Sequence, residues 1–308
     1  MRILITGANG YLGARLCQFL SNQGHDIIAV CKTHVPYEVG WTDKVKEIIT
    51  GDLILDKTIN KLTETKPDII IHLVSLNKKY SENSIDDALD INVRVTWKLV
   101  EKFSEFSLKK FIYLSTIHVE GFLIDNSKSD YNYKPESIYA LTHLMSEEIC
   151  NYYNRKTKTE CINIRLSNSY GEPLLKNTRC WELILNELVL MAYKKNRIVL
   201  NSNGLSSRNF IHYTELCKSI QSLIESKHQS IDKCIFIQSN QTCSLLEAAQ
   251  KIKSVFYKRY NKKIPIFINK NKLFSDNSQL KRKKNKLNSF QHLESGINDL
   301  FIYLENNS

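Results

Sequence analysis

The chain is predicted to form an α/β fold in which helices cover both faces of a doubly wound parallel sheet. Short apolar runs alternate with longer amphipathic stretches through the first half of its 308 residues, the pattern of consecutive βαβ units. Several runs are apolar throughout, which is typical of strands buried on both faces. A glycine-rich turn also follows the first run directly. The predicted strands are Arg2–Thr6, Asp26–Cys31, Glu47–Gly51, Asp68–Val74, Lys110–Ser115 and Glu160–Leu166, and the helices between them include Gly10–Gln23, Ile85–Phe106 and Pro135–Arg155.

The regular alternation ends after about Ser167, where shorter elements of both kinds follow. This part predicts a smaller, mixed C-terminal domain at the edge of the sheet where open α/β proteins bind ligands. We therefore expect a first domain over 1–167 and a second over 168–308, interleaved with the sheet edge. The predicted elements of the second are helices Arg179–Lys194, Tyr213–Ser226 and Ser244–Tyr260 and strands Arg197–Leu200 and Cys234–Gln238.

Composition excludes several classes of protein. With 42% hydrophobic residues the chain is neither disordered nor collagen-like, and no apolar run approaches the ~20 residues of a membrane span. The N-terminal residues form a predicted strand and not a secretory signal, so we expect a soluble, cytoplasmic protein with no membrane partner. The 8 cysteines are scattered, which favours reduced thiols over a disulfide framework or a zinc site, and we expect no metal.

The net charge of +11 indicates an anionic partner, either nucleic acid or a phosphorylated small molecule. The most basic stretch, Lys281–Lys284, is either an arm for nucleic acid or the solvated face of a terminal helix. Because a solvated face is the commoner structure for such a run, we expect no nucleic-acid partner.

The turn at residues 6–13, TGANGYLG, predicts a dinucleotide-binding, Rossmann-like domain. Glycines let the backbone approach a pyrophosphate, and the free N–H groups and partial positive charge of a helix N-terminus attract it. Glycines also occur in ordinary turns, but here a predicted strand precedes the turn and a predicted helix follows it. The expected cofactor contacts of this turn are Gly7, Asn9, Gly10, Tyr11, Leu12 and Gly13.

The residue that ends the second strand selects the cofactor. An acid there accepts a hydrogen bond from the ribose 2′-hydroxyl of NAD, whereas a basic residue accommodates the 2′-phosphate of NADP. The stretch 29–34 has no acid and one Lys, Lys32, so NADP is the predicted cofactor and NAD the alternative, in which Lys32 only contacts solvent. Asp52, after the third strand, is predicted to bind the adenine amino group or to cap the turn that follows it.

Taken in order along nearly the whole chain, these motifs resemble those of the extended short-chain dehydrogenase/reductases, in their sugar-nucleotide epimerase/dehydratase branch. GDL at 51–53 and HLVS at 72–75 are similar to the family's third and fourth strand endings, which implies cofactor contacts at Leu53 and Leu73. Four later segments also resemble family motifs: LSTIHVEG at 114–121, RLSNSYG at 165–171, SRNFIH at 207–212 and DNSQL at 276–280. The resemblance implies an NAD(P)-dependent enzyme acting on a nucleotide-activated sugar, with a dinucleotide-binding first domain, a substrate-binding second domain and a role in polysaccharide synthesis.

The family's chemistry uses a Tyr, a Lys four residues later on the same helix, and a Ser or Thr at the end of the fifth strand. Tyr139 and Thr116 match two of these positions. The resemblance implies that Tyr139 exchanges a proton with the sugar hydroxyl or ketone, and that Thr116 hydrogen-bonds the same oxygen. His143 occupies the position of the Lys, which contacts the nicotinamide ribose and lowers the pKa of the Tyr. Tyr139 and His143 are therefore expected at the cofactor as well.

The replacement of Lys by His143 affects the two reaction directions unequally. Histidine, with an ordinary pKa of ~6.5, is mostly neutral at pH 7 and does not favour tyrosinate as a cation does. Oxidation of an alcohol requires tyrosinate, whereas reduction of a ketone requires protonated tyrosine, so we predict a ketoreductase. The alternatives are an epimerase aided by another cation, with Lys78 and Lys79 as candidates, and a non-catalytic dinucleotide-binding protein.

Ile117 and His118 occupy the two positions where the family's dehydratases carry an Asp-Glu pair. Isoleucine donates no proton, so elimination of water is disfavoured, as is decarboxylation, which uses a Glu in this segment. His118 is predicted to contact the substrate, either as an acid/base at a ring carbon beside a ketone or as part of the site wall.

The resemblance also implies the groups on the substrate side. Asn168 and Arg208 are expected at the pyrophosphate, since a guanidinium donates to two phosphate oxygens at once. Asn209 stands where the family has Asp. A homodimer is implied too, packed through the helices Ile85–Phe106 and Pro135–Arg155. Neither the nucleotide nor the sugar is identified by these residues.

Overall fold

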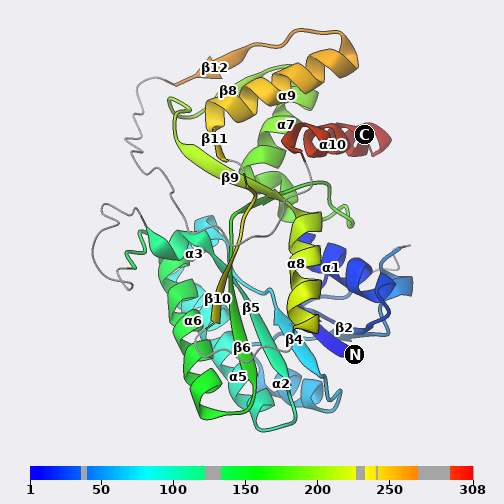
Figure 1. The fold of residues 1–308 in the computed structure, drawn as a ribbon, viewed down its shortest axis with the longest axis vertical. Coiled ribbons are helices and arrows are strands. Elements are labelled where there is room, and N and C mark those ends of the chain that lie inside the picture. The colour runs from blue at the N-terminus through cyan, green and yellow to red at the C-terminus, as the bar shows by residue number, and fades with distance from the viewer. Residues whose placement is uncertain (36–39, 122–132, 227–232, 241, 270–291, 308) are drawn as a thin grey trace. The chain divides into compact units, whose positions relative to one another are not determined.

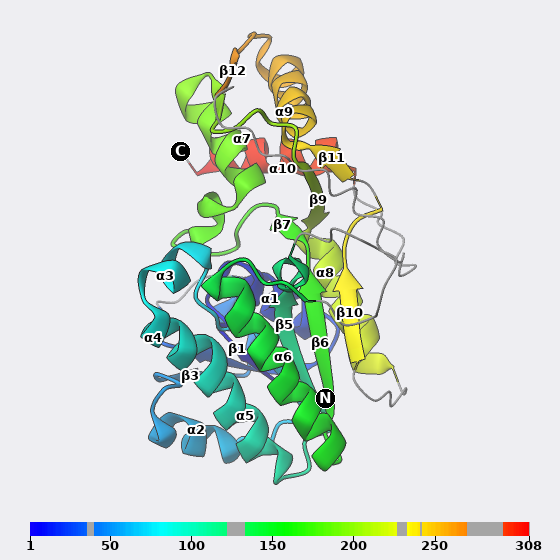
Figure 2. The same ribbon diagram turned by 90° about the vertical axis from the view of Figure 1, so that its left-hand side faces the viewer.

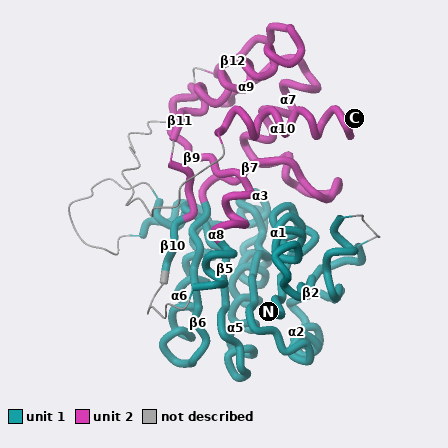
Figure 3. The backbone as a smooth tube through the Cα atoms, turned by 45° about the vertical axis from the view of Figure 1, so that its right-hand side comes forward, with its two compact units in different colours: residues 1–166, 220–236 teal, residues 167–219, 237–308 magenta. Residues whose placement is uncertain are grey.

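The computed structural model describes residues 1–308 with the exception of 36–39, 122–132, 227–232, 241, 270–291 and 308 (Figure 1). The chain divides into two compact units, shown in Figure 3. The first unit contains residues 1–166 and 220–236, and the second contains residues 167–219 and 237–308. The basic stretch Lys281–Lys284 and the motif at 276–280 lie outside the described residues.

The first unit is built on a seven-stranded sheet in the order β10-β6-β5-β4-β1-β2-β3. From β6 across to β3, neighbouring strands pair in parallel. The strand order reverses between β1 and β4, and this is where such sheets bind their ligands. The strands are β1 (Arg2–Thr6), β2 (Asp26–Cys31), β3 (Glu47–Thr50), β4 (Ile69–His72), β5 (Lys110–Thr116), β6 (Glu160–Leu166) and β10 (Lys233–Ile237).

Helices cover this sheet on both faces, as Figures 1 and 2 show, so the predicted doubly wound fold is confirmed. α1 packs on β1 and β2, whereas α6 packs on β5 and β6 and beside α5. The helices and turns are α1 (Tyr11–Asn22), η1 (Thr42–Lys44), α2 (Asp56–Thr63), α3 (Lys78–Asn83), α4 (Ile85–Ala88), η2 (Leu89–Arg94), α5 (Val95–Ser104), η3 (Ile117–Glu120) and α6 (Ile138–Lys156), with the C-terminal part of α8 (Tyr213–Glu225).

Three predicted strands have the predicted bounds: β1, β2 and β6. β1 and β2 are mostly apolar, whereas β6 also contains Glu160, Asn163 and Arg165; nearly all residues of the three strands are buried, because helices cover the sheet above and below. A helix or an exposed strand would leave part of such a short apolar run in contact with water. One face of the sheet contributes to an apolar core of the unit, in which Leu4, Ile28 and Ile70 from the strands meet Leu99 and Phe103 from α5.

The predicted helix Ile85–Phe106 is interrupted by the π-helical turn η2. Asn92 lies in this turn with a fully buried side chain. Its carbonyl oxygen accepts hydrogen bonds from the hydroxyls of Thr96 and Ser146, both at 2.7 Å, and its side chain accepts one from the N–H of Leu76 at 2.7 Å. Partners from other elements therefore stabilise the wider turn, which helical periodicity does not reveal.

The second unit has a small mixed sheet and a layer of helices. β9 pairs antiparallel with β11 and parallel with β7, while β8 and β12 form a separate parallel pair. The unit has an apolar core of its own, to which α7, α9 and α10 contribute. Its elements are β7 (Asn168–Tyr170), η4 (Arg179–Glu182), α7 (Ile184–Lys195), β8 (Ile198–Leu200), β9 (Ser207–His212), the start of α8, β11 (Thr242–Ser244), α9 (Leu245–Tyr260), β12 (Ile266–Ile268) and α10 (Leu293–Asn306).

One strand lies in a different place from the one predicted. The strand expected at Cys234–Gln238 in the second domain is β10, which belongs to the first unit and pairs beside β6. The second unit is therefore not one continuous segment. An apolar run predicts a strand but not its neighbour, because pairing depends on which sheet edge is free when the chain folds.

Two further observations concern the chain's covalent and membrane chemistry. All 8 cysteines are free in the structure, and six of them are buried. Of the helices in the described parts of the chain, none is long and apolar enough to cross a membrane.

Candidate active site

The turn after β1 has a backbone conformation and close contacts that require glycine. Gly7 has φ of +67°, in the left-handed region that favours glycine. A Cβ on Gly13 would lie 2.1 Å from the carbonyl oxygen of Gly7, so the helix and the turn can approach this closely only without one. α1 begins at Tyr11, and its N-cap, Gly10, offers no side-chain acceptor to the first-turn N–H groups. These donors and the space above the glycines fit a pyrophosphate.

The groups at the ends of β2 and β3 lie where the adenosine half of a dinucleotide is read. Cys31 ends β2; burial raises the pKa of its thiol to about 11, although a hydrogen bond with the backbone of Asn9 acts in the other direction. Lys32 Nζ lies 2.9 Å from Asp52 Oδ2, and Asp52 Oδ1 accepts the N–H of Ile54 at 3.1 Å. Lys32 is thus paired with a carboxylate from the neighbouring strand ending, and Asp52 also caps a turn.

Partial burial acts to raise the pKa of Asp52, but hydrogen bonds from the N–H of Ile54 and from Lys32 outweigh it, so the pKa is lowered. Asp52 is therefore a carboxylate at neutral pH. Leu53, the next residue, is only 6% exposed and its side chain belongs to the core of the first unit. Its expected contact with the cofactor remains a prediction.

A buried polar chain joins the glycine turn to the end of β4. Thr96 Oγ1 donates to the carbonyl of Asn92, so His72 Nε2, 3.1 Å from it, carries the hydrogen. His72 Nδ1 then accepts from Thr6 Oγ1 at 2.7 Å. The N–H of Leu73 donates to the same Thr6 oxygen at 3.2 Å, which holds Leu73 beside the turn. Burial lowers the pKa of His72 to about 3, with a smaller contribution from His143.

Thr116 and Tyr139, predicted from separate motifs, lie together. Thr116 ends β5, and its Oγ1 accepts the N–H of His118 at 3.2 Å, which begins the turn η3. Tyr139 lies in the first turn of α6, which Ser137 caps through the N–H of Ala140 at 3.1 Å. Burial raises the pKa of Tyr139, and a hydrogen bond with Thr116 opposes this shift. The phenol is therefore protonated at neutral pH.

His143 lies one helical turn below Tyr139 and is 1% exposed. Its Nδ1 is 2.9 Å from the carbonyl oxygen of Tyr139, and because a carbonyl only accepts, Nδ1 carries the hydrogen. The two rings are 4.3 Å apart between centroids. Burial lowers the pKa of His143 to about 4, partly offset by the bond to Tyr139. His143 is therefore neutral at pH 7, and its Nε2 presents a lone pair rather than a donor.

His118 is a second histidine near Tyr139. Its ring centroid is 6.3 Å from that of Tyr139, in an edge-on arrangement, and its side chain is exposed. A positive charge on His118 acts to lower the pKa of His143. Ile117, its neighbour, is 7% exposed and has no titratable group. Of the two positions occupied by acids in the family's dehydratases, only His118 can exchange a proton.

The predicted substrate residues Asn168 and Arg208 belong to the second unit and are described there by themselves. Asn168 Nδ2 donates to the carbonyl of Asn209 at 3.0 Å, and Arg208 Nη1 donates to the carbonyl of Ser207 at 2.9 Å. Asn209 has partners of its own: its Oδ1 accepts the N–H of Ser239 at 2.9 Å and its Nδ2 donates to the carbonyl of that residue at 2.8 Å. The amide of Asn209 both donates to and accepts from the backbone of Ser239, whereas the carboxylate of an Asp at this position could only accept.

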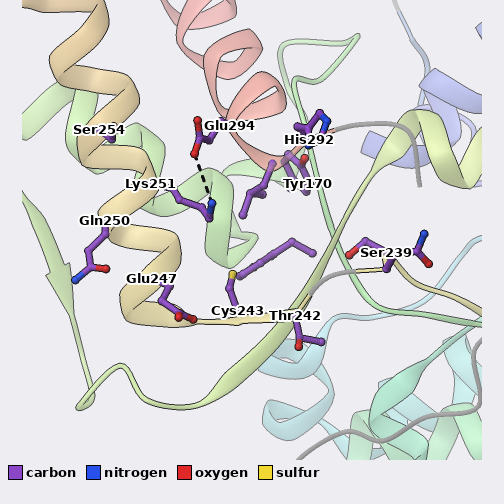
Figure 4. A pocket seen from close by; sticks show the side chains of 13 residues that line it. Tyr170, Ser239, Thr242, Cys243, Glu247, Gln250, Lys251, Ser254, His292 and Glu294 are labelled. Atoms are coloured by element: carbon purple, nitrogen blue, oxygen red, sulfur yellow. Dashed lines mark hydrogen bonds and ion pairs between the residues drawn. The ribbon is translucent and has the colours of Figure 1, made fainter. Parts of the chain in front are cut away.

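A cavity of about 590 Å³ also lies in the second unit, between α9, α10 and the small sheet (Figure 4). Polar side chains line much of it, among them Lys251 and Glu294, which form an ion pair at 3.5 Å. The residues that line it do not include Asn168 or Arg208. The cavity is therefore separate from the predicted pyrophosphate contacts.

Sequence reasoning gave no role to several buried polar residues of the first unit: Asn92 and Glu147, and Ser115 and Arg165, which lie within the family motifs. A signal for Glu147 was present, because an acid falls at helical spacing from Tyr139 and His143 on a face otherwise meant for the core. Lys78 and Lys79, the cations suggested as substitutes for the family's Lys, begin α3, and Lys79 Nζ lies 5.8 Å from the ring of Tyr80.

The chain matches the model of the NAD dependent epimerase/dehydratase family over residues 3–236 and therefore belongs to that family. The resemblance seen in the motifs is confirmed, and so is the expectation of an NAD(P)-dependent enzyme of this class.

Curated relatives are distant but extend over much of the chain. A Bacillus subtilis (strain 168) protein named "Uncharacterized UDP-glucose epimerase YtcB" is 23% identical over 273 residues, which is 83% of this chain and 82% of that protein. The uronate dehydrogenase of Pseudomonas putida is 26% identical over 195 residues, 61% of this chain and 68% of that protein.

Solved structures share the fold. The UDP-glucuronic acid 4-epimerase of Bacillus cereus, in complex with UDP-glucuronic acid and NAD, is 22% identical with a TM-score of 0.79, and 100% of both chains is covered. The UDP-glucose 4-epimerase of Thermotoga maritima, with UDP-glucose, is 15% identical with a TM-score of 0.83, over 100% of this chain and 99% of that one. At these identities the likeness shows the fold alone.

Proposed function

We propose that this enzyme reduces the keto group of a nucleotide-activated sugar, with Tyr139 as the proton donor. The observation that carries the proposal is the pair Tyr139–His143. Burial raises the pKa of the phenol, and the residue beside it is a neutral histidine instead of a cation. A protonated tyrosine is the form that ketone reduction uses, whereas alcohol oxidation needs the scarce tyrosinate.

The roles of the side chains follow from this state. When bound, the nicotinamide supplies the hydride. Tyr139 gives its proton to the carbonyl oxygen as that oxygen gains negative charge, and Thr116 donates a hydrogen bond to the same atom. His143 Nε2 accepts a hydrogen bond from a ribose hydroxyl, which orients the ring without a positive charge. His118 is at the substrate, where it returns a proton from solvent to Tyr139 after each reduction.

A nucleotide sugar is the proposed substrate class. The solved relatives named above bind UDP-sugars, and the curated relatives are named for sugar chemistry. Asn168 and Arg208 are the proposed pyrophosphate contacts, because an amide and a guanidinium both donate to phosphate oxygens.

We propose NADP as the preferred cofactor, through Lys32 at the 2′-phosphate. The charge of Lys32 is offset by Asp52 at 2.9 Å, so the preference is a moderate one. NAD is the alternative, and NAD is the cofactor in the solved relative from Bacillus cereus.

A second candidate function is epimerisation of a nucleotide sugar, favoured by the names of the relatives in both comparisons. In that reaction Tyr139 takes a proton from the hydroxyl and gives it back to the ketone, so both of its protonation states are used within one turnover. The raised pKa of Tyr139 and the neutral His143 favour reduction over this alternative.

The enzyme is proposed to be a cytoplasmic homodimer that packs through α5 and α6. These helices lie side by side and expose four large apolar side chains, Trp97, Leu141, Met145 and Tyr152, each between 39% and 49% accessible. Apolar groups gathered on two adjacent helices are typical of a self-association surface. Sedimentation velocity on the wild type and on Met145→Glu tests this, with a monomeric variant as the expected result.

The proposed cytoplasmic location agrees with the free thiols, which are typical of a reducing compartment.

The deciding experiment is a cofactor-oxidation assay on purified protein. NADPH and NADH absorbance is followed against a panel of 4-keto-6-deoxy sugar nucleotides. Consumption of NADPH with one nucleotide sugar is the expected result. If every pair is silent while a 4-epimerase assay on UDP-glucose or UDP-glucuronic acid is positive, the epimerase function replaces the reductase.

A further inference from the structure

A buried carboxylate joins three elements of the first unit, two of which carry Thr116 and Tyr139. Glu147, on α6, is 2% exposed. Its Oε1 accepts the hydroxyl of Ser115 at 2.5 Å and the Nε of Arg165 at 3.0 Å, while its Oε2 accepts Arg165 Nη2 at 2.6 Å. Ser115 and Arg165 are also buried and face each other across β5 and β6. The carboxylate therefore binds helix α6 to both strands.

Two of these residues, Ser115 and Glu147, lie on the elements that carry the proposed catalytic groups. Ser115 directly precedes Thr116 on β5. Glu147 follows Tyr139 and His143 at successive helical turns, so all three lie on one face of α6. The hydrogen bond between Ser115 and Glu147 thus connects the strand that carries Thr116 to the helix that carries Tyr139.

Arg165 extends the connection to the segments on either side of 122–132. Its Nη1 lies 3.6 Å from Glu120 Oε1, at the end of the turn that carries His118. Its guanidinium lies 4.4 Å from the ring of Tyr133, just before α6. The same two segments touch directly, because a Cβ on Gly121 would lie 1.8 Å from the carbonyl oxygen of Lys134. Arg165 therefore contacts the segment that follows Thr116, through Glu120, and the segment that precedes Tyr139, through Tyr133.

Burial of two charges is costly, and apolar residues of similar volume often stabilise a fold as well as a buried ion pair does. Stability alone does not call for Glu147 and Arg165 at these positions. Resting on the proposed reduction, we propose that Glu147, with Ser115 and Arg165, is a positioning residue that sets Thr116 Oγ1 against the Tyr139 hydroxyl. Displacement of a reacting group by about 1 Å lowers a rate by up to about 100-fold.

The same two strands supply a matched control at their other ends. Lys110 and Glu160 face each other across the first residues of β5 and β6, with Nζ and Oε2 at 3.5 Å and side-chain exposures of 9% and 8%. Lys110 also donates to the carbonyls of Leu223 and Ser226 at the end of α8. This pair is buried, charged and far along the strands from Thr116, so it has structural consequences only.

The test uses the full-length protein, loaded with NADP⁺ or NADPH, in three forms. Ser115→Ala removes only the hydroxyl. The double variant Glu147→Leu/Arg165→Met removes both charges together, so that neither remains buried alone. Glu160→Gln is the control. For each, kcat and KM for the keto-sugar, cofactor affinity and thermal unfolding are measured, and 3-fluorotyrosine at position 139 reports the ring's surroundings by ¹⁹F NMR.

The expected result is a fall in kcat of about tenfold or more in Ser115→Ala and in the double variant, with little change in KM or cofactor affinity and a displaced or broadened fluorine resonance. Glu160→Gln is expected to keep wild-type kcat and resonance whatever its effect on unfolding. A double variant that folds and keeps both the kcat and the resonance of the wild type would overturn the proposal. If the wild type reduces no keto-sugar, the proposed function fails, and the fluorine resonance still decides the positioning role.

Discussion

The two ends of the parallel sheet differ in how they hold their titratable side chains. At the amino ends of the strands, charged groups satisfy one another: Lys46 Nζ is 2.9 Å from Asp26, and Lys109 Nζ is 2.7 Å from Asp68. Hydrogen bonds from these lysines lower the pKa of both carboxyls, which stay charged. Each carboxylate is paired with a lysine of opposite charge.

At the carboxyl ends one such pair, Lys32 with Asp52, is also present, but three titratable groups further along the sheet are shifted by burial instead. The pKa of His72 falls to about 3 and that of His143 to about 4, while the pKa of Tyr139 rises. In each case burial favours the neutral form, and the shift is opposite to the one that a nearby counter-charge would cause. Groups held neutral in this way are typical of sites that move protons, whereas paired charges are typical of the fold's periphery. The difference supports the proposal that the carboxyl ends of the strands carry the reaction.

The largest expected effect is at Tyr139. Tyr139→Phe removes the proton donor but keeps the ring, so we expect kcat to fall by about 10² to 10⁴ while cofactor affinity changes little. Steady-state kinetics and a cofactor titration measure the two. Tyr153→Phe, at the far end of the same helix, is the control, because its hydroxyl donates to Glu101 at 2.9 Å and accepts from Trp97 Nε1 at 3.2 Å, both on α5. Equal losses in both variants would break the distinction between the site and the periphery.

The histidines should make stability depend on pH. His143 has a pKa of about 4 when folded, below its ordinary value of about 6.5, so only the unfolded chain binds a proton between these values. Its contribution is fully present above about pH 6.5 and is lost as the pH falls towards 4, by about 2 kcal/mol between pH 7 and 5. Urea unfolding of the wild type and of His143→Asn measures this, and the variant should lose less. His34→Asn, at an exposed histidine, should follow the wild type.

A positive charge at position 143 should change the balance between reduction and oxidation. In His143→Lys a cation beside the phenol is expected to lower the pKa of Tyr139 by about 1–3 units. Oxidation of the sugar alcohol should then rise about tenfold near pH 8, whereas reduction should change little. His143→Gln separates the loss of the imidazole from the gain of charge. If neither direction responds to the lysine, the state of Tyr139 does not set the direction.

The smallest expected effect is on cofactor choice. Asp52→Asn removes the carboxylate that offsets Lys32, so the affinity for NADPH relative to NADH should rise about tenfold, or ~1.4 kcal/mol. Isothermal titration gives both affinities without turnover. Asp26→Asn breaks an ion pair of the same length at the opposite ends of the same two strands and should leave the ratio unchanged. An equal loss for both cofactors would instead indicate that Asp52 contacts the adenine.

Much of the fold could be predicted because its information is local. β1 and β2 are mostly apolar runs that a covered sheet buries, and the spacing of Gly7, Gly10 and Gly13 follows from the need for backbone to meet backbone. These features depend on neighbours a few residues away. The family motifs added Thr116 and Tyr139, which the structure brings together.

The remaining features depend on contacts between distant parts of the chain. The π turn at Asn92 exists because Ser146 and Leu76 supply its partners. Glu147 meets Ser115 and Arg165 only once α6 lies across β5 and β6.

The sequence by itself determined the doubly wound sheet, its glycine turn and the residue types of the site, because hydrophobic periodicity and backbone sterics act locally. Only the tertiary structure decided that β10 joins the large sheet, that Lys32 is paired with Asp52, and that His143 is neutral with its lone pair on Nε2. Protonation states and ion pairs depend on burial and on neighbours in space, and neither is defined until the chain has folded.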